Sequence, residues 1–218
     1  MSIAIGLGLM EFPFADAGGY WRWVDLCEAG GIDSLWQTDR LVCRQPILEC
    51  MTTMAALAGH TRRIKFGMNV VSLDFRDPVL LARQCTTIDV LSDGRLLPGF
   101  GIGSPLAPEW QALGGDTAGR GARTDEALNV LTRLWHEETV DFEGRFFHLR
   151  GVSIAPRPAA GRFAVGDAAT ILARLRAFID QGVSKFILHP LAQGEVETLK
   201  QTRRLIETIL PAIPNLDA

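Results

Sequence analysis

The residues best suited to chemistry in this chain stand where predicted strands end. Asp39 and Arg40 directly follow an apolar run at 34–37. In a parallel β/α protein, functional groups gather at the carboxyl ends of the strands, and there Arg40 would offer a fixed cation to an anionic substrate. Asp39 can instead pair with a nearby arginine and only shape the loop. Both interpretations of this pair stay open.

A series of glycines follows the fourth predicted strand. Gly99, Gly101 and Gly103 alternate with other residues, and Ser104 comes next. Glycine allows positive φ angles and lets the backbone approach a ligand closely. The series does not match the Gly-x-Gly-x-x-Gly dinucleotide pattern, because Leu106 occupies the place of the third glycine. The alternatives are a backbone wall for a cofactor and a tight turn with close helix packing.

Two further residues, Glu109 and His189, could take part in chemistry. Glu109 lies in a segment that we expect to be an exposed loop, and it could act as a general acid or base. His189 ends the last predicted strand and could reach a ligand, whereas a hydrogen-bonded structural histidine before Pro190 fits the sequence equally well. The histidines and cysteines lack the spacing of a zinc site, so no metal is predicted.

Repeated strand-and-helix units position these residues. Apolar runs predict the strands, and helical spacing or capping signals predict the helices between them. Asp77 before Pro78 predicts the start of one helix, and Gly59 predicts the end of another. This alternation predicts an α/β fold with a parallel sheet that right-handed crossovers curl toward a barrel. The opening strands are predicted at 3–10, 34–37, 64–71 and 96–102.

The second half of the chain departs from the alternation. A complete (β/α)8 barrel has eight strands and typically about 250 residues, which this chain of 218 residues does not supply. We therefore predict one domain over residues 1–218, an incomplete TIM-type barrel with mostly parallel strands and a β-hairpin insertion. The elements expected in this half are a hairpin at 140–149, a loop at 155–161, a helix at 167–181, a strand at 184–189 placed beside 3–9, and a final helix near 196–210.

Composition excludes several classes of function. The chain is 47% apolar and 22% charged, and its net charge of −3 comes with scattered basic residues, which gives no sign of nucleic-acid binding. No stretch reaches the roughly 18 apolar residues of a membrane span, and the N-terminus enters a strand directly. A cytoplasmic protein is expected. Cys27 and Cys85 fall on apolar helix faces, which favours buried thiols over disulfides.

Four segments, 33–41, 64–71, 75–82 and 91–103, resemble the luciferase-like monooxygenase family. Many members have a histidine after the aspartate at the end of the second strand, whereas a subgroup that uses the deazaflavin F420 has Asp-Arg, as at Asp39-Arg40. The resemblance implies an F420-dependent oxidoreductase that transfers hydride to or from a small organic substrate. An FMN-dependent monooxygenase of the same family is the alternative.

The resemblance also implies roles for individual residues. Asp39, Arg40 and Glu109 would be catalytic. In several family members, the peptide bond that matches Asn69-Val70 is cis without proline and forms a bulge behind the cofactor ring. The residues implied in cofactor binding are Asn69, Val70, Gly101, Gly103, Ser104 and His189.

Family members have several further β/α units where this chain has only the stretch between about 158 and 163. Those units ordinarily supply part of the phosphate site, so a degenerate protein that binds a ligand without turnover is a third alternative. Their loss would also leave a strand edge and apolar faces uncovered. We therefore expect a homodimer or higher oligomer, with the hairpin or a partner's helix over the opening.

Overall fold

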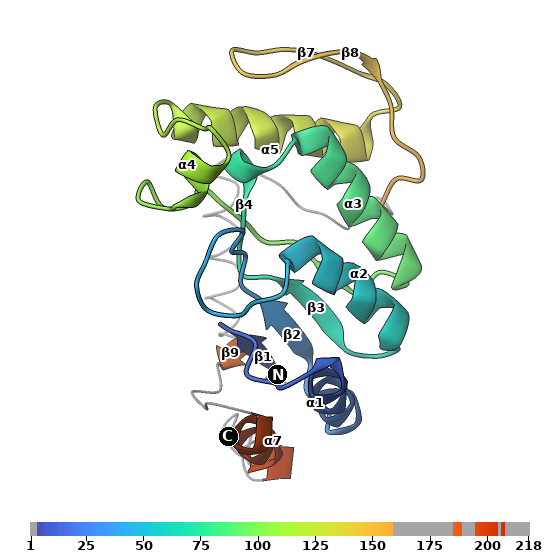
Figure 1. Cartoon of the computed structure of the whole chain (residues 1–218). Helices are drawn as coiled ribbons and strands as arrows, with labels where there is room; N and C mark the ends of the chain where they lie inside the picture. Colours follow the sequence, from blue (N-terminus) through green and yellow to red (C-terminus); the bar gives the residue numbers. More distant parts are fainter. Residues whose placement is uncertain (1–3, 159–184, 189–194, 205, 208–218) are drawn as a thin grey trace, which may run out of the picture.

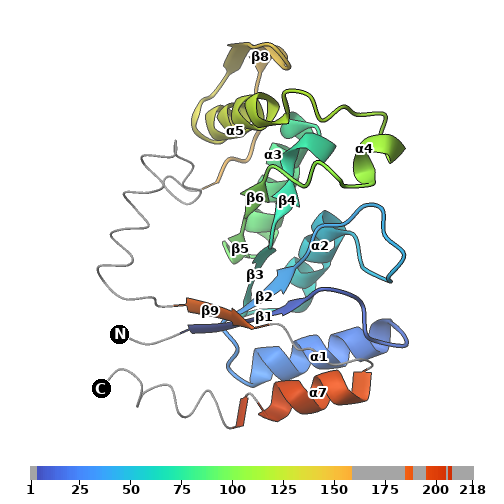
Figure 2. The same ribbon diagram turned by 90° about the vertical axis from the view of Figure 1, so that its left-hand side faces the viewer.

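A computed structural model describes residues 4–158, 185–188, 195–204 and 206–207 of the chain (Figures 1 and 2). Its centre is a parallel sheet with the strand order β5-β3-β2-β1-β9. Predicted and observed bounds agree at the second strand, which occupies 34–37 in both. The strands of this sheet are β1 (Ala4–Leu9), β2 (Ser34–Gln37), β3 (Lys65–Met68), β5 (Leu96–Leu97) and β9 (Lys185–Leu188).

The closing strand β9 lies beside β1, as the sequence predicted. The pairing is parallel, with Ala4 opposite Lys185 and Leu7 opposite Leu188. The predicted strand extended to His189, which lies outside the described residues, as do the predicted helix at 167–181 and the stretch at 159–163. The pairing of β9 with β1 places the last described strand in the sequence next to the first, as in a barrel, where the first and last strands are neighbours.

The third and fourth strands are each interrupted, so the predicted unbroken strands at 64–71 and 96–102 are wrong in this detail. After the break, β4 (Val71–Ser72) and β6 (Phe100–Gly101) form a separate parallel pair. Pro98 lies at the second break and has no N–H to donate to a ladder. The Val71 N–H donates to the Gly99 carbonyl at 2.9 Å, which joins the start of β4 to the residue before β6.

Helices α1, α2 and α3 cover one face of the sheet (Figure 1). The predicted start of α3 is confirmed. The Asp77 carboxylate accepts a hydrogen bond from the Leu80 N–H at 2.9 Å, and Pro78 is the first residue of the helix. The prediction that Gly59 ends α2 is wrong, because the helix continues to His60. The helices are α1 (Ala17–Ala29), α2 (Cys50–His60), α3 (Pro78–Leu91), α4 (Glu109–Ala112), α5 (Arg120–His136) and α7 (Glu195–Arg204), with a 3-10 turn at η1 (Leu73–Phe75).

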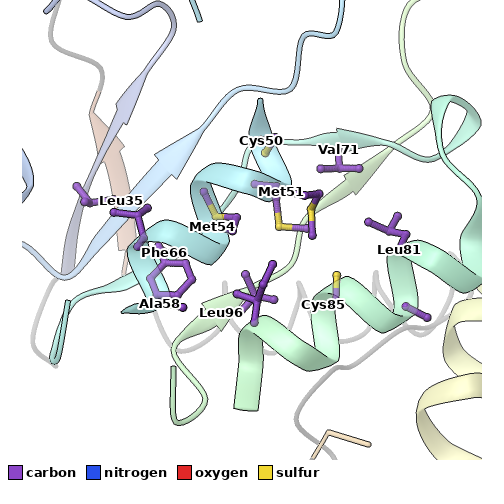
Figure 3. Close-up of a cluster of buried hydrophobic side chains, with 14 of the residues drawn as sticks. Leu35, Cys50, Met51, Met54, Ala58, Phe66, Val71, Leu81, Cys85 and Leu96 are labelled. Carbon is purple, nitrogen blue, oxygen red and sulfur yellow. The ribbon is translucent and has the colours of Figure 1, made fainter. Parts of the chain in front are cut away.

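The main core lies between the sheet and these helices. Figure 3 shows Leu35 and Phe66 from the strands meeting Met54 of α2 and Cys85 of α3 in one cluster. Each large apolar side chain buried in this way contributes about 1.5–3 kcal/mol. Cys27 and Cys85 are buried and unpaired, as predicted. Burial raises the pKa of the Cys85 thiol to about 12, so this thiol stays protonated at neutral pH.

Helix α7 packs against α1, as Figure 2 shows. The Trp23 indole N–H donates to the Thr202 hydroxyl at 3.0 Å, and both side chains are buried. Arg22 pairs with Glu195 at 2.6 Å at the exposed edge of the contact. Helix α7 therefore belongs to the same layer as α1, next to the β1–β9 pair.

The predicted hairpin is present as β7 (Val140–Glu143) and β8 (His148–Val152), which pair antiparallel. It lies beside α5 and away from the main sheet (Figure 1). Glu126 of α5 accepts hydrogen bonds from three backbone amides of the turn, at residues 145–147. The described residues thus form an α/β fold with mostly parallel strands, an incomplete barrel that carries a hairpin insertion.

Candidate active site at the carboxyl ends of the strands

Asp39, which follows β2, is a buried anchor of the strand ends. Its side chain is only 1% exposed, and the Arg76 guanidinium donates to both carboxylate oxygens, at 2.8 and 3.0 Å. The Ser72 N–H donates to Oδ2 at 3.2 Å. Burial raises the pKa of Asp39, against the opposing effect of Arg76 and of the Ser72 amide. This geometry matches the ion pair that the sequence left open as the alternative.

Arg76 also binds the other end of the loop that follows β2. Its Nη2 donates to Glu49 Oε1 at 2.7 Å. Glu49 caps α2, because its carboxylate accepts from the amides of Met51 and Thr52 at 3.2 and 2.7 Å. One guanidinium therefore ties both ends of the segment 39–49. Arg76 was not singled out from the sequence, although an arginine after one strand and an aspartate after its neighbour is a detectable signal for such a pair.

Glu109 is buried, which corrects the expectation of an exposed loop carboxylate. The residue is 2% exposed, because the short helix α4 turns its side chain toward the backbone after Arg40. Oε1 accepts from the amides of Leu41 and Val42 at 3.2 and 3.3 Å. The Arg40 Nε lies 3.8 Å from the same oxygen, while half of the Arg40 side chain stays exposed. Glu109 thus holds the short segment that carries Arg40.

The Asn69-Val70 peptide bond is cis, as the family resemblance implied. The Asn69 N–H donates to the Gln37 carbonyl at 2.9 Å, which holds this segment against the end of β2. The Val70 side chain is 44% exposed and lies over Gly101, where an added Cβ would stand 2.7 Å from Val70 Cγ2. A side chain at Gly99 would likewise meet the Met68 carbonyl at 2.5 Å. These glycines are required by the close approach of the two backbones.

Gly103 and Ser104 shape the turn that follows β6. Gly103 has a φ of 72°, which favours glycine, and an added Cβ there would lie 3.1 Å from the Ser72 hydroxyl. The Ser104 hydroxyl accepts from the Leu106 N–H at 3.2 Å, and its carbonyl accepts from the Trp110 indole at 2.9 Å. Ser72 connects this turn to Asp39. The predicted residue His189 lies outside the described part of the chain.

The structure therefore brings the predicted residues together in two groups that share the carboxyl ends of the strands. One group contains Asp39, the 69–70 segment and the glycines, and Ser72 lies between Asp39 and Gly103. The other group contains Arg40 and Glu109. Exposed apolar side chains stand at the same strand ends, at Met10, Val70 and Ile102. Such a surface can hold an apolar ring next to a cation, while Asp39 and Glu109 are buried behind it.

Comparison with known proteins places the chain in a family. A family model described as luciferase-like monooxygenase matches residues 16–170, which include β2 to β8. The chain belongs to the luciferase-like monooxygenase family. The matched range therefore contains the ends of β2, β3 and β6 described above, together with Asp39, Arg40 and Glu109. Among the residues that the structure describes, no group of histidine, cysteine and acidic side chains is arranged to hold a metal ion, and no helix is long and apolar enough to cross a membrane.

Curated relatives of this luciferase-like chain include F420-dependent glucose-6-phosphate dehydrogenases. The protein of that name from Nocardia farcinica is 35% identical over 112 residues, which are 50% of this chain and 33% of the relative. The one from Kineococcus radiotolerans is 30% identical over 139 residues, 60% of this chain and 41% of the relative. The matched part of the chain thus spans less than half the length of these relatives.

Solved structures confirm the predicted fold. The monooxygenase RslO1 from Streptomyces bottropensis matches 97% of this chain and 67% of its own, with a TM-score of 0.67 and 25% identity. An F420-dependent secondary alcohol dehydrogenase in complex with an F420-acetone adduct matches 95% of this chain and 66% of its own, with a TM-score of 0.65 and 19% identity. The described part of the chain thus has the fold of these proteins.

Proposed function

We propose that this chain is an F420-dependent oxidoreductase that transfers hydride to or from a small organic substrate. The observation that carries the proposal is the similarity to proteins named F420-dependent glucose-6-phosphate dehydrogenases, at 35% identity over 112 residues for one of them. The structure supports it through the exposed cation at Arg40, which lies after the end of β2. The sugar phosphate of those relatives is not assigned to this chain, because the matches cover only 33% and 41% of their length.

The residues at the strand ends fit the ring of such a cofactor. Val70 offers an exposed apolar surface, and Gly101 beside it leaves room for the Val70 side chain, since an added Cβ would stand 2.7 Å from Val70 Cγ2. When bound, F420 supplies hydride chemistry through its ring, and the protein contributes position and electrostatics. We assign cofactor contacts to Asn69, Val70, Gly101, Gly103 and Ser104, and we keep His189 as a further candidate.

Three charged residues would act around that ring in different ways. Arg40 is exposed and would touch an anionic substrate or the reduced cofactor. Asp39 and Glu109 are buried, so they would act through their neighbours: Asp39 through Ser72 and Arg76, and Glu109 through the segment that carries Arg40. We therefore propose Arg40 as the contacting residue and the two carboxylates as positioning residues.

An FMN-dependent monooxygenase is the second candidate. It is favoured by the structural match to the monooxygenase RslO1 and by a match to the FMN complex of the oxygenating constituent of 3,6-diketocamphane monooxygenase, with a TM-score of 0.57. A third candidate is a binding protein without turnover, which the short matched share of the relatives supports. The ligand that binds distinguishes these three.

A titration of the purified chain with F420 and with FMN, followed by fluorescence and calorimetry, tests the proposal. Saturable binding of F420 with weak or absent binding of FMN is the expected result. Binding of FMN alone would favour the monooxygenase, and binding of neither would contradict both enzyme proposals. The same titration can be repeated on Arg40→Ala, and its control is Arg44→Ala, which removes another exposed arginine from the same loop.

We also propose a homodimer, formed by a single-domain chain in the cytoplasm. Leu80 and Leu91 are 58% and 66% exposed on α3, and such apolar surface commonly marks a protein contact. Burial of this surface against a second copy would cover it. Light scattering at micromolar concentration should give twice the monomer mass. A monomer at that concentration would contradict the dimer.

A further inference from the structure

Trp36 occupies the interior face of the incomplete barrel. The strand register places Gly8, Trp36, Gly67 and Leu97 side by side on four neighbouring strands. Successive side chains of a strand point to opposite faces. Leu35 and Phe66, one position earlier on their strands, belong to the core that α2 and α3 cover (Figure 3). Trp36 therefore points to the other face, which is the inside of the barrel.

Glycines on both neighbouring strands make room for the indole of Trp36. A Cβ added at Gly6 of β1 would lie 2.7 Å from Trp36 Nε1, and one added at Gly67 of β3 would lie 2.8 Å from Trp36 Cζ3. The indole therefore extends over β1 at one end and over β3 at the other. In closed barrels, layers of branched side chains fill this space. Among the described residues of this layer, the Trp36 indole lies between two glycine positions, and Leu97 follows on the next strand.

The orientation of this indole is fixed. Its N–H donates to the Ser34 hydroxyl at 2.9 Å, so the polar edge of the ring is satisfied on the side of the amino ends of the strands. Ser34 is itself buried, while Trp36 remains partly exposed. In the direction of the carboxyl ends, the chain continues from β3 into Asn69 and Val70. The indole thus lies below the strand ends where the candidate site is.

We propose that Trp36 forms the floor of the ligand site and stacks on a planar conjugated ring that enters from the carboxyl ends of the strands. This inference rests on the proposed function, and it names the residue that determines how deeply the ring can enter. An aromatic ring on an oriented indole gains contact area and an offset-stacked or edge-to-face geometry. Replacement of the indole by an aliphatic side chain should weaken ring binding about two- to tenfold.

The test uses Trp36→Leu and Trp36→Phe, titrated with F420 and with FMN as the two probes. Calorimetry gives the dissociation constant, and tryptophan emission reports contact between the ring and an indole. The expected result is a two- to tenfold weaker affinity for Trp36→Leu, a smaller loss for Trp36→Phe, and a smaller fractional quenching in both. Trp21→Phe is the matched control, because Trp21 stacks on His60 at 4.2 Å on the helix side of the sheet.

The outcomes separate this inference from the proposed function. If the wild-type chain binds F420 or FMN and both Trp36 variants bind it equally well with equal quenching, the stacking floor is wrong and the proposed function stands. If the wild-type chain binds neither probe, both proposals are wrong. Circular dichroism establishes that the variants are folded. If Trp36→Leu does not fold, the affinity and quenching of Trp36→Phe, which keeps an aromatic ring in the same space, test whether the indole stacks on the bound ring.

Discussion

The Arg76 guanidinium and the Asp39 carboxylate form a two-fold hydrogen-bonded pair across the ends of neighbouring strand units, at 2.8 and 3.0 Å. Arg76 is 11% exposed and Asp39 is 1% exposed, so both charges are largely removed from water. Loss of one partner from such a pair leaves the other buried and uncompensated, which costs more than loss of both. The pair can therefore be tested by a double-mutant cycle.

Arg76→Met should reduce the free energy of unfolding by about 3–5 kcal/mol, because it leaves the Asp39 carboxylate buried without its cation. The double variant Arg76→Met with Asp39→Asn should be more stable than Arg76→Met alone, since the remaining group is neutral. Urea denaturation of the two variants and of Asp39→Asn measures this coupling. Additive effects of the two substitutions would contradict a coupled pair.

Arg40→Ala should weaken the binding of an anionic ligand or turnover while the midpoint of thermal unfolding stays nearly unchanged. The guanidinium is half exposed and lies 3.8 Å from Glu109, so the ion pair contributes at most about 1 kcal/mol. Calorimetry with F420 and a thermal melt measure the two quantities, with Arg44→Ala as the control. A large loss of stability with unaltered binding would show instead that Arg40 is structural.

Glu28→Gln should flatten the dependence of stability on pH in the acid range. Burial alone would raise the pKa of Glu28, but hydrogen bonds from the Ile64, Arg63 and Arg62 amides lower it below its ordinary value. A lowered folded-state pKa contributes stability that is present above the unfolded value of about 4.3 and is lost as pH falls through the folded value.

Thermal midpoints measured from pH 7 down to pH 3 test this expectation. Wild type should lose more stability over the acid range than Glu28→Gln does, by at most about 1 kcal/mol because Glu28 is partly exposed and solvent screens its carboxylate. Glu138→Gln is the control, since the Glu138 side chain is 91% exposed. Parallel curves for wild type and Glu28→Gln would show that these three amides do not matter to stability.

Two glycines should respond to alanine in opposite directions. Gly103→Ala should destabilise the chain by about 1–2 kcal/mol, because φ is 72° there and a Cβ is disfavoured at such an angle. Gly59→Ala should stabilise it by up to about 1 kcal/mol, because Gly59 lies within α2 and an added Cβ would have open space around it. Denaturant midpoints of the two variants measure both effects, and the same sign for both would contradict the argument.

Features that depend on a few adjacent residues could be predicted from the sequence. The Asp77-Pro78 helix start and the second strand at 34–37 are of this kind, and the family resemblance added the cis bond at 69–70. The burial of Glu109 could not be predicted, because it depends on amides of residues 41–42 that only the folded chain places nearby. The position of Trp36 depends on the register of three strands, which no local pattern contains.

The pairing of β1 with β9 has a consequence for the order in which the chain can fold. Strand β1 is made well before β9 during synthesis, so one of its edges is completed only when residues 185–188 emerge. Trp23 must likewise wait for Thr202, which is 179 positions later. Contacts between such distant residues slow folding and leave strand edges open to wrong pairing in the meantime. One edge of β1 is therefore open to wrong pairing until β9 has been synthesised, and during that time the nascent chain can aggregate along it.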